Sequence, residues 1–261
     1  MDDSTILSAE NLSRVFGSGA LQVRAVDDIS FSLRRGEIVS IVGESGSGKS
    51  TLARLMLGLL PISSGKITFE GKDVGHMHGL HAHRAYWRKV QAIFQDPFAS
   101  FNQFFSVQRV LHSALRLSEK PLTKQERSDM IRSALESVKL SPDDVLSKIP
   151  HELSGGQRQR VMIARAIMLK PHLLIADEPT TMIDASSRAT VLNVLLDLHE
   201  SYNPTIVFIT HDISLAAYVS DRLFIMHNGK IVERGSVEHV MKSSSDEYTR
   251  QLFSDTFSMV R

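Results

Sequence analysis

The sequence predicts an α/β protein with a mainly parallel sheet flanked by helices, an N-terminal antiparallel β subdomain and an inserted helical subdomain. Short, nearly continuous apolar runs such as Glu37–Val42 are typical of strands buried on both faces. Runs of this kind alternate with helical patterns, which indicates a parallel sheet covered by helices. From about residue 106 to 139 the apolar residues instead recur three and four positions apart, which favours helices.

The N-terminal part of the chain is predicted to contain strands of two kinds. Polar and apolar residues alternate over Ile6–Phe16 and Val23–Leu33, as in an antiparallel sheet. The buried strand Glu37–Val42 is followed by a helix over Thr51–Leu60, which Pro61 and the turn Ser63-Ser64-Gly65 are expected to end. Further strands are expected at Lys66–Phe69 and Val90–Phe94.

The C-terminal part returns to strand–helix alternation. Asn228-Gly229 is a strong turn signal between two apolar runs and predicts a hairpin. The expected elements are, in order, a helix Gln157–Leu169, a strand Leu173–Ala176, a helix Ala185–Glu200, a strand Thr205–Thr210, a helix Ile213–Ser220, and the hairpin strands Leu223–Met226 and Lys230–Glu233.

Composition excludes several classes of protein. The 261 residues are 42% hydrophobic and 23% charged, which is ordinary for a globular domain. Thirty Lys and Arg against 29 Asp and Glu give a net charge of +1, so no basic field indicates nucleic acid as a partner. The absence of cysteine excludes disulfides and thiolate metal sites, and it fits a cytoplasmic protein. We expect no signal peptide and no membrane span, since no apolar run approaches about 20 residues.

A phosphate-binding pattern follows the buried strand. Its glycines allow successive backbone N–H groups to face phosphate oxygens, and the helix behind them adds its positive N-terminal end. Lys49 would reach the β- and γ-phosphates, and the hydroxyl of Ser50 would bind Mg²⁺. The pattern G-x-x-x-x-G-K-[ST] is filled by the segment we call the phosphate loop, Gly43, Glu44, Ser45, Gly46, Ser47, Gly48, Lys49 and Ser50, with Thr51 next to it.

Two further motifs make the pattern more specific. The segment Leu153–Gln157 reads Leu-Ser-Gly-Gly-Gln, and we call it the signature segment. Farther along, the apolar run Leu173–Ala176 ends in Asp177-Glu178. In this order the three motifs resemble the ATP-binding cassette (ABC) ATPases. The resemblance implies a P-loop NTPase fold in a single ABC ATPase domain that binds ATP and Mg²⁺.

The resemblance also implies how this domain is divided. Residues 1–95 and 153–242 would form a RecA-like core with the N-terminal antiparallel sheet. Residues 96–152 would form the helical subdomain, with the signature segment at its end. Residues 243–261 would be a short C-terminal tail.

Beside Lys49, which matches a catalytic position of that family, four further residues match its metal-binding or catalytic positions. Asp177 would hold Mg²⁺, and Glu178, followed by Pro179-Thr180 as in the family pattern, would polarise the attacking water. Gln95 would reach Mg²⁺ and the water. His211, after the strand Thr205–Thr210, would hydrogen-bond the γ-phosphate.

Other positions would act on a second subunit or on the base. Ser154, Gly155, Gly156 and Gln157 would contact the ATP of the partner subunit. Asp184 would bridge the subunits, although Met182 and Ile183 before it are bulkier than the usual Ala-Leu. Phe16 would stack on adenine; a buried core position is the competing interpretation.

Four histidines, His76, His78, His81 and His83, lie close together in the sequence. Their spacing does not place all four on one face of a helix or strand, and no Cys or Asp lies among them. We therefore expect a solvated loop rather than a metal site.

Two segments narrow the resemblance to oligopeptide, dipeptide and nickel importers. They are Ile93–Asn102 and the tail around Tyr248-Thr249. The resemblance implies two ATPase subunits under two membrane permeases, with an extracellular or periplasmic substrate-binding protein. The chain would then be cytoplasmic and peripheral on the inner face of the cell membrane. Phe98, Phe101, Phe104 and Phe105 are candidate contacts to the permeases, although for any one of them a core position is favoured.

Three alternatives stay open beside a peptide importer. One is a nickel or oligosaccharide importer, because an ATPase subunit does not touch the cargo. Another is a soluble ABC ATPase outside transport. The third is a P-loop phosphotransferase, which would leave the signature segment and His211 unexplained.

Overall fold

The computed structural model describes residues 4–95, 102 and 104–258. These residues form two compact units. Unit 1 contains the chain up to His78 and from Thr205 onward, and unit 2 contains Gly79–Pro204. Within the described ranges, no helix has both the length and the apolar character that crossing a membrane requires.

Unit 1 contains an antiparallel sheet in the order β2-β1-β4-β5. The parallel strands of unit 1 are not part of this antiparallel sheet. Among them, β3 lies between β8 and β9 and pairs with both. β10 closes this group antiparallel to β9. The strands are β1 (Thr5–Phe16), β2 (Val23–Arg34), β3 (Ile38–Val42), β4 (Ser64–Phe69), β5 (Lys72–Asp73), β8 (Thr205–Thr210), β9 (Arg222–His227) and β10 (Lys230–Ser236).

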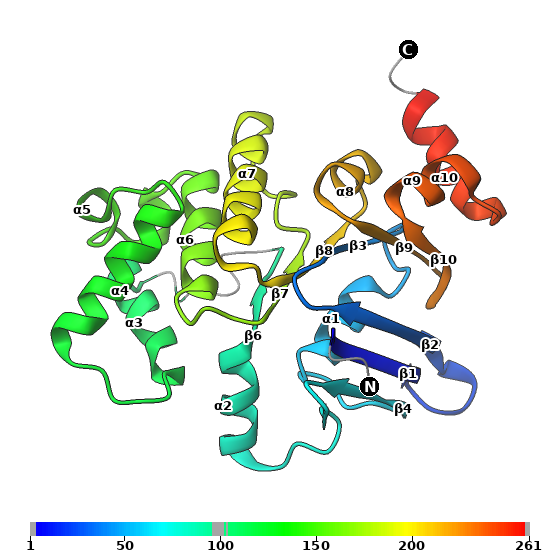
Figure 1. Cartoon of the computed structure of the whole chain (residues 1–261), viewed down its shortest axis with the longest axis horizontal. Coiled ribbons are helices and arrows are strands. Elements are labelled where there is room, and N and C mark those ends of the chain that lie inside the picture. Colours follow the sequence, from blue (N-terminus) through cyan, green and yellow to red (C-terminus); the bar gives the residue numbers. More distant parts are fainter. Residues whose placement is uncertain (1–3, 96–101, 103, 259–261) are drawn as a thin grey trace. The chain divides into compact units, whose positions relative to one another are not determined.

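Burial explains the apolar runs. Every residue of β3 and β8 is buried, as predicted for strands covered on both faces. Figure 1 shows α8, α9 and α10 gathered on one side of this parallel group. The helices of unit 1 are α1 (Lys49–Met56), α8 (Ile213–Val219), α9 (Val237–Ser243) and α10 (Glu247–Ser258), with a short 3-10 turn at Gly19–Leu21.

Unit 2 pairs β6 (Val90–Ile93) in parallel with β7 (Leu173–Asp177), and every residue of β7 is buried. Helix α6 contacts β6, α4 and α7. Arg160 of α6 donates to the carbonyl oxygen of Lys139 at 2.7 Å, just beyond the end of α4. The helices are α2 (Gly79–Lys89), α3 (Val107–Ala114), α4 (Lys124–Ser137), α5 (Pro142–Val145), α6 (Gly155–Ile167) and α7 (Ala185–Tyr202), with 3-10 turns at Leu115–Leu117 and Pro150–Glu152.

The end of α1 differs from the prediction. The helix stops at Met56, before Pro61 is reached, because Gly58 adopts φ +65°. The amides of Gly58 and Leu59 then donate to the carbonyls of Leu55 and Arg54, which closes the helix as a Schellman motif. The turn after the helix therefore begins at this glycine.

Helices α2, α5 (Pro142–Val145), α9 and α10 were not among the elements expected from the sequence. Helix α2 buries only Tyr86 among its residues, so its apolar pattern is too weak to indicate a helix. Helix α10 occupies most of the segment predicted to be a tail. The expected division into core, helical subdomain and tail stays a prediction, since the two units do not test it.

Candidate functional site

The residues expected to bind nucleotide fall in both units. In unit 1 the phosphate loop connects β3 to α1. Lys49 is only 5% exposed. Its ammonium group donates to the carbonyl oxygens of Gly43 at 2.8 Å and Glu44 at 2.7 Å, and to the hydroxyl of Ser47 at 3.3 Å. The charge therefore lies inside the curve of the loop.

Backbone groups of other elements lie against both ends of the phosphate loop. A Cβ on Gly43 would lie 2.1 Å from the carbonyl oxygen of Met226, and one on Gly48 would lie 2.1 Å from that of Ala25. Gly48 also has φ +104°, which disfavours any other residue. The amide of Gly229 donates to the carbonyl oxygen of Ser47 at 3.0 Å. Strands β2 and β9 and the β9–β10 turn thus support the loop, which the sequence motif did not reveal.

The middle of the loop and the start of α1 fit an anionic phosphate. Glu44, Ser45 and Gly46 are exposed, and a Cβ on Gly46 would meet nothing within 4 Å. Among the described side chains none caps α1 at Gly48. Helix N-terminal amides beside an inward ammonium group are the donors that bind phosphate oxygens. The residues present therefore fit the expected nucleotide.

His211 and Phe16 also lie in unit 1. His211 is exposed in the turn between β8 and α8. That turn is fixed because the amide of Asp212 donates to the hydroxyl of Thr210, and the Asp212 carboxylate caps α8. Phe16 ends β1 with 36% exposure, and the Arg14 guanidinium lies 4.5 Å from its ring centroid. Phe16 is thus not a buried core residue, and its stacking on adenine stays a prediction.

In unit 2 the structure brings Gln95 and Glu178 together. Glu178 directly follows β7, whose last residue, Asp177, is buried. The Gln95 side-chain amide donates to Oε2 of Glu178 at 3.3 Å, and the Thr181 hydroxyl donates to the same oxygen at 2.8 Å. We call Gln95, Glu178 and Thr181 the carboxylate cluster. Thr181 was missed by the sequence analysis, although its position three residues after Glu178 suits such a contact.

The backbone of Glu178 is unusual. Its φ of +48° places it in the left-handed region, which costs roughly 1–2 kcal/mol for a residue with a Cβ. A residue in this region persists only where the surrounding structure over-determines its conformation. Such residues are frequent at functional sites. Here the two donors to Oε2 fix the direction of the carboxylate in addition to the backbone.

The signature segment begins α6 with a reciprocal cap. The Ser154 hydroxyl accepts from the amide of Gln157 at 3.2 Å, and the Gln157 side chain accepts from the amide of Ser154 at 3.0 Å. Both side chains therefore have structural roles beside the expected contact to a partner's ATP.

The glycines of the signature segment pack against the turn that precedes α7. A Cβ on Gly156 would lie 2.7 Å from the hydroxyl oxygen of Ser187, and one on Gly155 would lie 3.5 Å from the side chain of Ile183. Ile183 is buried, whereas Met182 is 60% exposed. The Ile183 side chain thus fills space next to the signature segment.

Asp184 is the N-cap of α7. Its carboxylate accepts hydrogen bonds from the Ser186 hydroxyl at 2.5 Å and from the Ser187 amide at 2.9 Å. These donors, led by Ser186, lower the pKa of Asp184 to about 2. Asp184 is exposed, so its charge lies on the surface of unit 2.

The four histidines of residues 76–83 are not gathered into one cluster. In the described ranges no group of three or more His, Cys, Asp or Glu side chains could hold a metal ion. His76 is exposed, and its Nδ1 donates a hydrogen bond to the Asp73 carboxylate at 3.0 Å. His81 and His83 lie in α2, and the ring of His83 is 5.3 Å from that of Trp87. The expectation of a loop was therefore wrong for these two residues.

The four phenylalanines divide into two groups. Phe98 and Phe101 lie outside the described residues. Phe104 is 80% exposed, so the favoured core position is wrong for it. Phe105 is partly buried, with the Arg109 guanidinium 3.6 Å from its ring centroid.

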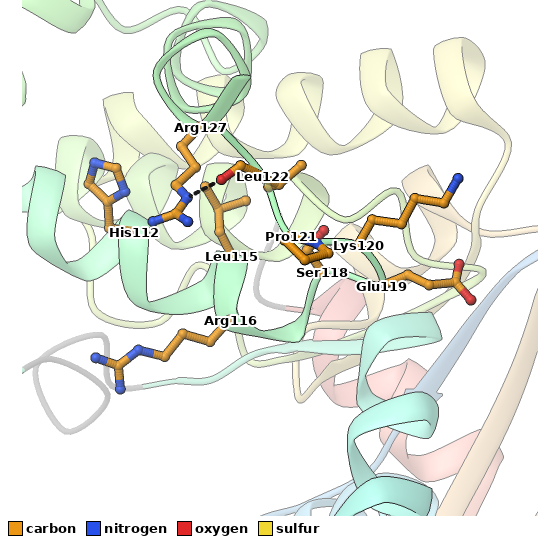
Figure 2. Close-up of a pocket in the computed structure, with 9 residues that line it drawn as sticks. All are labelled: His112, Leu115, Arg116, Ser118, Glu119, Lys120, Pro121, Leu122 and Arg127. Carbon is orange, nitrogen blue, oxygen red and sulfur yellow. Dashed lines mark hydrogen bonds between the residues drawn. The ribbon is translucent and has the colours of Figure 1, made fainter. Parts of the chain in front are cut away.

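A separate cavity of about 350 Å³ lies in unit 2 near the connection from α3 to α4 (Figure 2). Arg127 donates to the carbonyl oxygen of Leu122 there at 3.1 Å. The charged ends of Arg116, Glu119 and Lys120 point away from Arg127, so the polar groups do not converge (Figure 2). None of the expected site residues lines this cavity. Its lining is His112, Leu115, Arg116, Ser118, Glu119, Lys120, Pro121, Leu122 and Arg127.

Comparisons with known proteins agree with this geometry. A family model described as "ABC transporter" matches residues 26–181. The chain is 40% identical over 250 residues to the oligopeptide transport ATP-binding protein OppF of Streptococcus mutans, covering 95% of this chain and 80% of that protein. It is 41% identical over 252 residues to the dipeptide transport ATP-binding protein DppF of Lactococcus lactis subsp. cremoris, with the same coverage.

One solved structure confirms the predicted fold class. It is a dimeric structure of an ATP-binding cassette bound to ADP and Pi. The two chains are 24% identical, with a TM-score of 0.81 over 89% of this chain and 99% of that one.

Proposed function

This chain belongs to the ABC transporter family, and we propose that it is the ATPase subunit that powers import of a peptide through partner membrane permeases. Relatives that are 40% and 41% identical over 95% of the chain are named as oligopeptide and dipeptide transport ATP-binding proteins. These names favour a peptide over nickel or an oligosaccharide as the cargo.

The carboxylate cluster is the observation that carries the proposal. A strained glutamate at the end of a buried strand, held by a glutamine and a threonine, is an arrangement suited to orienting a water molecule. The phosphate loop supplies the complementary half of the chemistry, which is recognition of the phosphates. A phosphotransferase would need an acceptor site, whereas this cluster can act on water alone.

In the proposed reaction the phosphate loop binds the nucleotide. Backbone amides and Lys49 hold the β- and γ-phosphates, and Phe16 stacks on the base. His211 donates a hydrogen bond to a γ-phosphate oxygen. When bound, Mg²⁺ would neutralise charge that develops on the phosphates, and Ser50, Asp177 and Gln95 are the residues that would hold it.

Glu178 orients the attacking water and accepts its proton. The water oxygen forms a bond to the γ-phosphorus as the bond from that phosphorus to the oxygen of ADP breaks. Gln95 and Thr181 keep the carboxylate directed while this happens. Positioning and electrostatic stabilisation supply most of the acceleration in reactions of this class.

The signature segment is proposed to act on the ATP of a second ABC ATPase subunit, which is identical or related. Ser154, Gly155 and Gly156 would donate to the γ-phosphate there, and Asp184 would contact the partner. Because the closed pair binds the γ-phosphate better than the open pair does, ATP favours closure and its hydrolysis favours opening. Two permeases would convert closure into import, with the chain held peripherally at the inner membrane face.

The proposal is tested by Glu178→Gln, with Glu200→Gln on the exposed end of α7 as the matched control. We expect phosphate release by Glu178→Gln to fall by at least about 100-fold, since general-base catalysis contributes about 10²–10⁴-fold. The control should hydrolyse ATP normally. Normal turnover by Glu178→Gln would show that the base has been assigned to the wrong residue.

A further inference from the structure

The C-terminal helix of unit 1 reaches the phosphate loop. Tyr248 is the second residue of α10, and its phenol oxygen accepts a hydrogen bond from the backbone amide of Glu44 at 3.2 Å. The two residues are 204 positions apart in the chain. The contact therefore exists only because the chain folds back over the loop.

Tyr248 is held in place by a second contact. Its ring lies against that of His227, with centroids 3.9 Å apart and planes tilted by 30°. Partial burial raises the pKa of the Tyr248 hydroxyl above its usual value of 10. The phenol thus stays protonated at neutral pH, and its oxygen accepts a neutral hydrogen bond.

The start of α10 is anchored by buried polar contacts. Thr249 is fully buried, and both its amide and its hydroxyl donate to one carboxylate oxygen of Asp246, at 2.9 and 3.2 Å. Glu233 of β10 accepts from the hydroxyl of Ser244 and the amide of Ser245. These groups fix the residues on both sides of Tyr248, so its hydroxyl is presented in one direction.

The middle of the helix is held by apolar packing. Phe253 of α10 is buried in a cluster that includes Ile213 and Ala216 of α8. Helix α10 is therefore anchored to unit 1 at its start and at its middle. A flexible tail would be too mobile to hold a hydroxyl at one position of the loop.

The part of the loop that Tyr248 contacts is also held through the carbonyl oxygen of Glu44, which accepts from the Lys49 ammonium group and from the Ser47 amide. Strands β2 and β9 and the β9–β10 turn hold Gly43, Ser47 and Gly48. The intervening Glu44–Gly46 is exposed, and Gly46 has open space around it at φ +83°. An exposed segment with an unhindered glycine has more accessible conformations than a buried one, so holding it in the conformation that presents N–H groups to a phosphate costs conformational entropy.

We propose that Tyr248 is a positioning residue for ATP, whose hydroxyl fixes the amide of Glu44 and so holds the exposed part of the phosphate loop in its binding conformation. This inference rests on the proposed role of the phosphate loop. If the binding-competent fraction of the loop falls, the apparent affinity for nucleotide falls in proportion. The contact would act on binding of ATP and leave the chemistry at the carboxylate cluster unchanged.

The test compares full-length variants that differ by single groups. Tyr248→Phe removes the hydroxyl but keeps the ring against His227. Tyr218→Phe is the matched control, because Tyr218 lies on α8 of the same unit and is 67% exposed. Lys49→Ala reports whether the phosphate loop binds ATP at all. Kd for ATP with Mg²⁺ is measured by calorimetry, and kcat and KM by phosphate release.

We expect Tyr248→Phe to raise Kd and KM about three- to tenfold, as the loss of one neutral hydrogen bond predicts, with kcat changed by less than about twofold. Tyr218→Phe should bind as the unmodified protein does. A merely structural role would lower the melting temperature and the active fraction, and it would leave KM of the folded protein unchanged. That pattern would overturn the proposal.

Amide exchange gives a second readout that does not depend on activity. In the nucleotide-free protein the Glu44 amide should exchange faster with solvent in Tyr248→Phe than in Tyr218→Phe, because its acceptor is gone. Equal exchange in both variants would overturn the contact. If Lys49→Ala also binds ATP normally, the role of the phosphate loop has failed. If Lys49→Ala loses ATP and Tyr248→Phe does not, only the inference on Tyr248 has failed.

Discussion

At the scale of single residues, the direction of the Glu178 carboxylate depends on two hydrogen-bond donors at very different sequence separations. Thr181 is three residues away and Gln95 is 83 residues away, yet both donate to the same carboxylate oxygen. Thr181, the donor nearer in the sequence, has the shorter hydrogen bond, 2.8 Å against 3.3 Å for Gln95. Thr181 is therefore the stronger constraint on the direction of the carboxylate.

Thr181→Val should lower kcat for ATP hydrolysis by about tenfold, since a hydrogen bond to a charged group contributes about 1.5–3 kcal/mol. The substitution keeps the shape of the side chain and removes only the donor. Thr190→Val, at a partly buried position of α7, is the control and should leave kcat unchanged. The measurement is phosphate release at saturating ATP. Equal rates for the two variants would rule out a role of Thr181 in catalysis.

Asp184 gives a prediction for pH. Its folded-state pKa of about 2 is below its ordinary value of 3.8, chiefly because of the hydrogen bond from Ser186. The stability that the charged cap contributes is therefore complete above about pH 4 and is lost as the pH falls towards 2. We expect Asp184→Asn to melt below the unmodified protein at pH 7, with a smaller gap at pH 3. A carbon-13 titration of the Asp184 carboxyl with a midpoint near 4 would contradict this.

At the scale of elements, two hairpin turns share one conformation and differ in their surroundings. Asn228-Gly229 joins β9 to β10 with φ values of 46° and 78°, and Glu70-Gly71 joins β4 to β5 with 47° and 76°. A Cβ on Gly229 would lie 2.9 Å from the carbonyl oxygen of Arg24, whereas one on Gly71 would meet nothing within 4 Å. The turn at Gly229 also supports the phosphate loop through Ser47.

Gly71→Ala should therefore lower the free energy of unfolding only by the strain of a left-handed residue with a Cβ, roughly 1–2 kcal/mol. Gly229→Ala should cost at least about 1 kcal/mol more, because the backbone must also move away from Arg24. We further expect weaker binding of ATP by Gly229→Ala alone. Urea unfolding measures the first difference and calorimetry the second. Equal losses in the two variants would show that crowding at Gly229 has no energetic effect.

At the scale of the whole molecule, the expected contacts of Ser154 and Asp184 require a second subunit. The signature segment and Asp184 pack together in unit 2 through Gly156 and Ser187, so they would present one surface to a partner. A symmetric pair uses the same surface on both subunits. Nucleotide binding and subunit association should therefore be coupled.

If the chain pairs with itself, Glu178→Gln should double in mass on addition of ATP, as measured by light scattering after size exclusion. Adding Ser154→Arg to this variant should abolish the doubling, because a large cation would stand where the partner's nucleotide approaches. Ser201→Arg, on the exposed end of α7, is the matched control and should not affect it. Doubling that survives Ser154→Arg would contradict the role of the signature segment.

Affinity purification from gently solubilised native membranes tests the proposed partners. We expect two multi-spanning permeases to co-purify with the chain, because the proposed function assigns it to the membrane only through them. A second, related ATPase chain in the same fraction would identify a heteromeric pair. Recovery of soluble proteins alone would exclude transport and leave a soluble ABC ATPase.

The sequence by itself determined the fold class, the strands of the parallel group and the expected nucleotide residues. β8 was predicted at its observed bounds, and β3 within one residue, because strands buried on both faces need continuous apolar runs. The phosphate loop was recognisable because close approach of backbone to phosphate requires glycine at fixed positions. These are local requirements, which a sequence records directly.

Only the tertiary structure decided which distant groups support those residues. The carbonyl oxygens of Met226 and Ala25 lie against the phosphate loop, and Tyr248 contacts the loop although it is 204 residues away in the chain. The pairing of Gln95 with Glu178 likewise arises when the chain folds. No spacing rule relates such positions, because each contact follows from how whole elements pack. Chain topology therefore decided what holds the motifs that the sequence had shown.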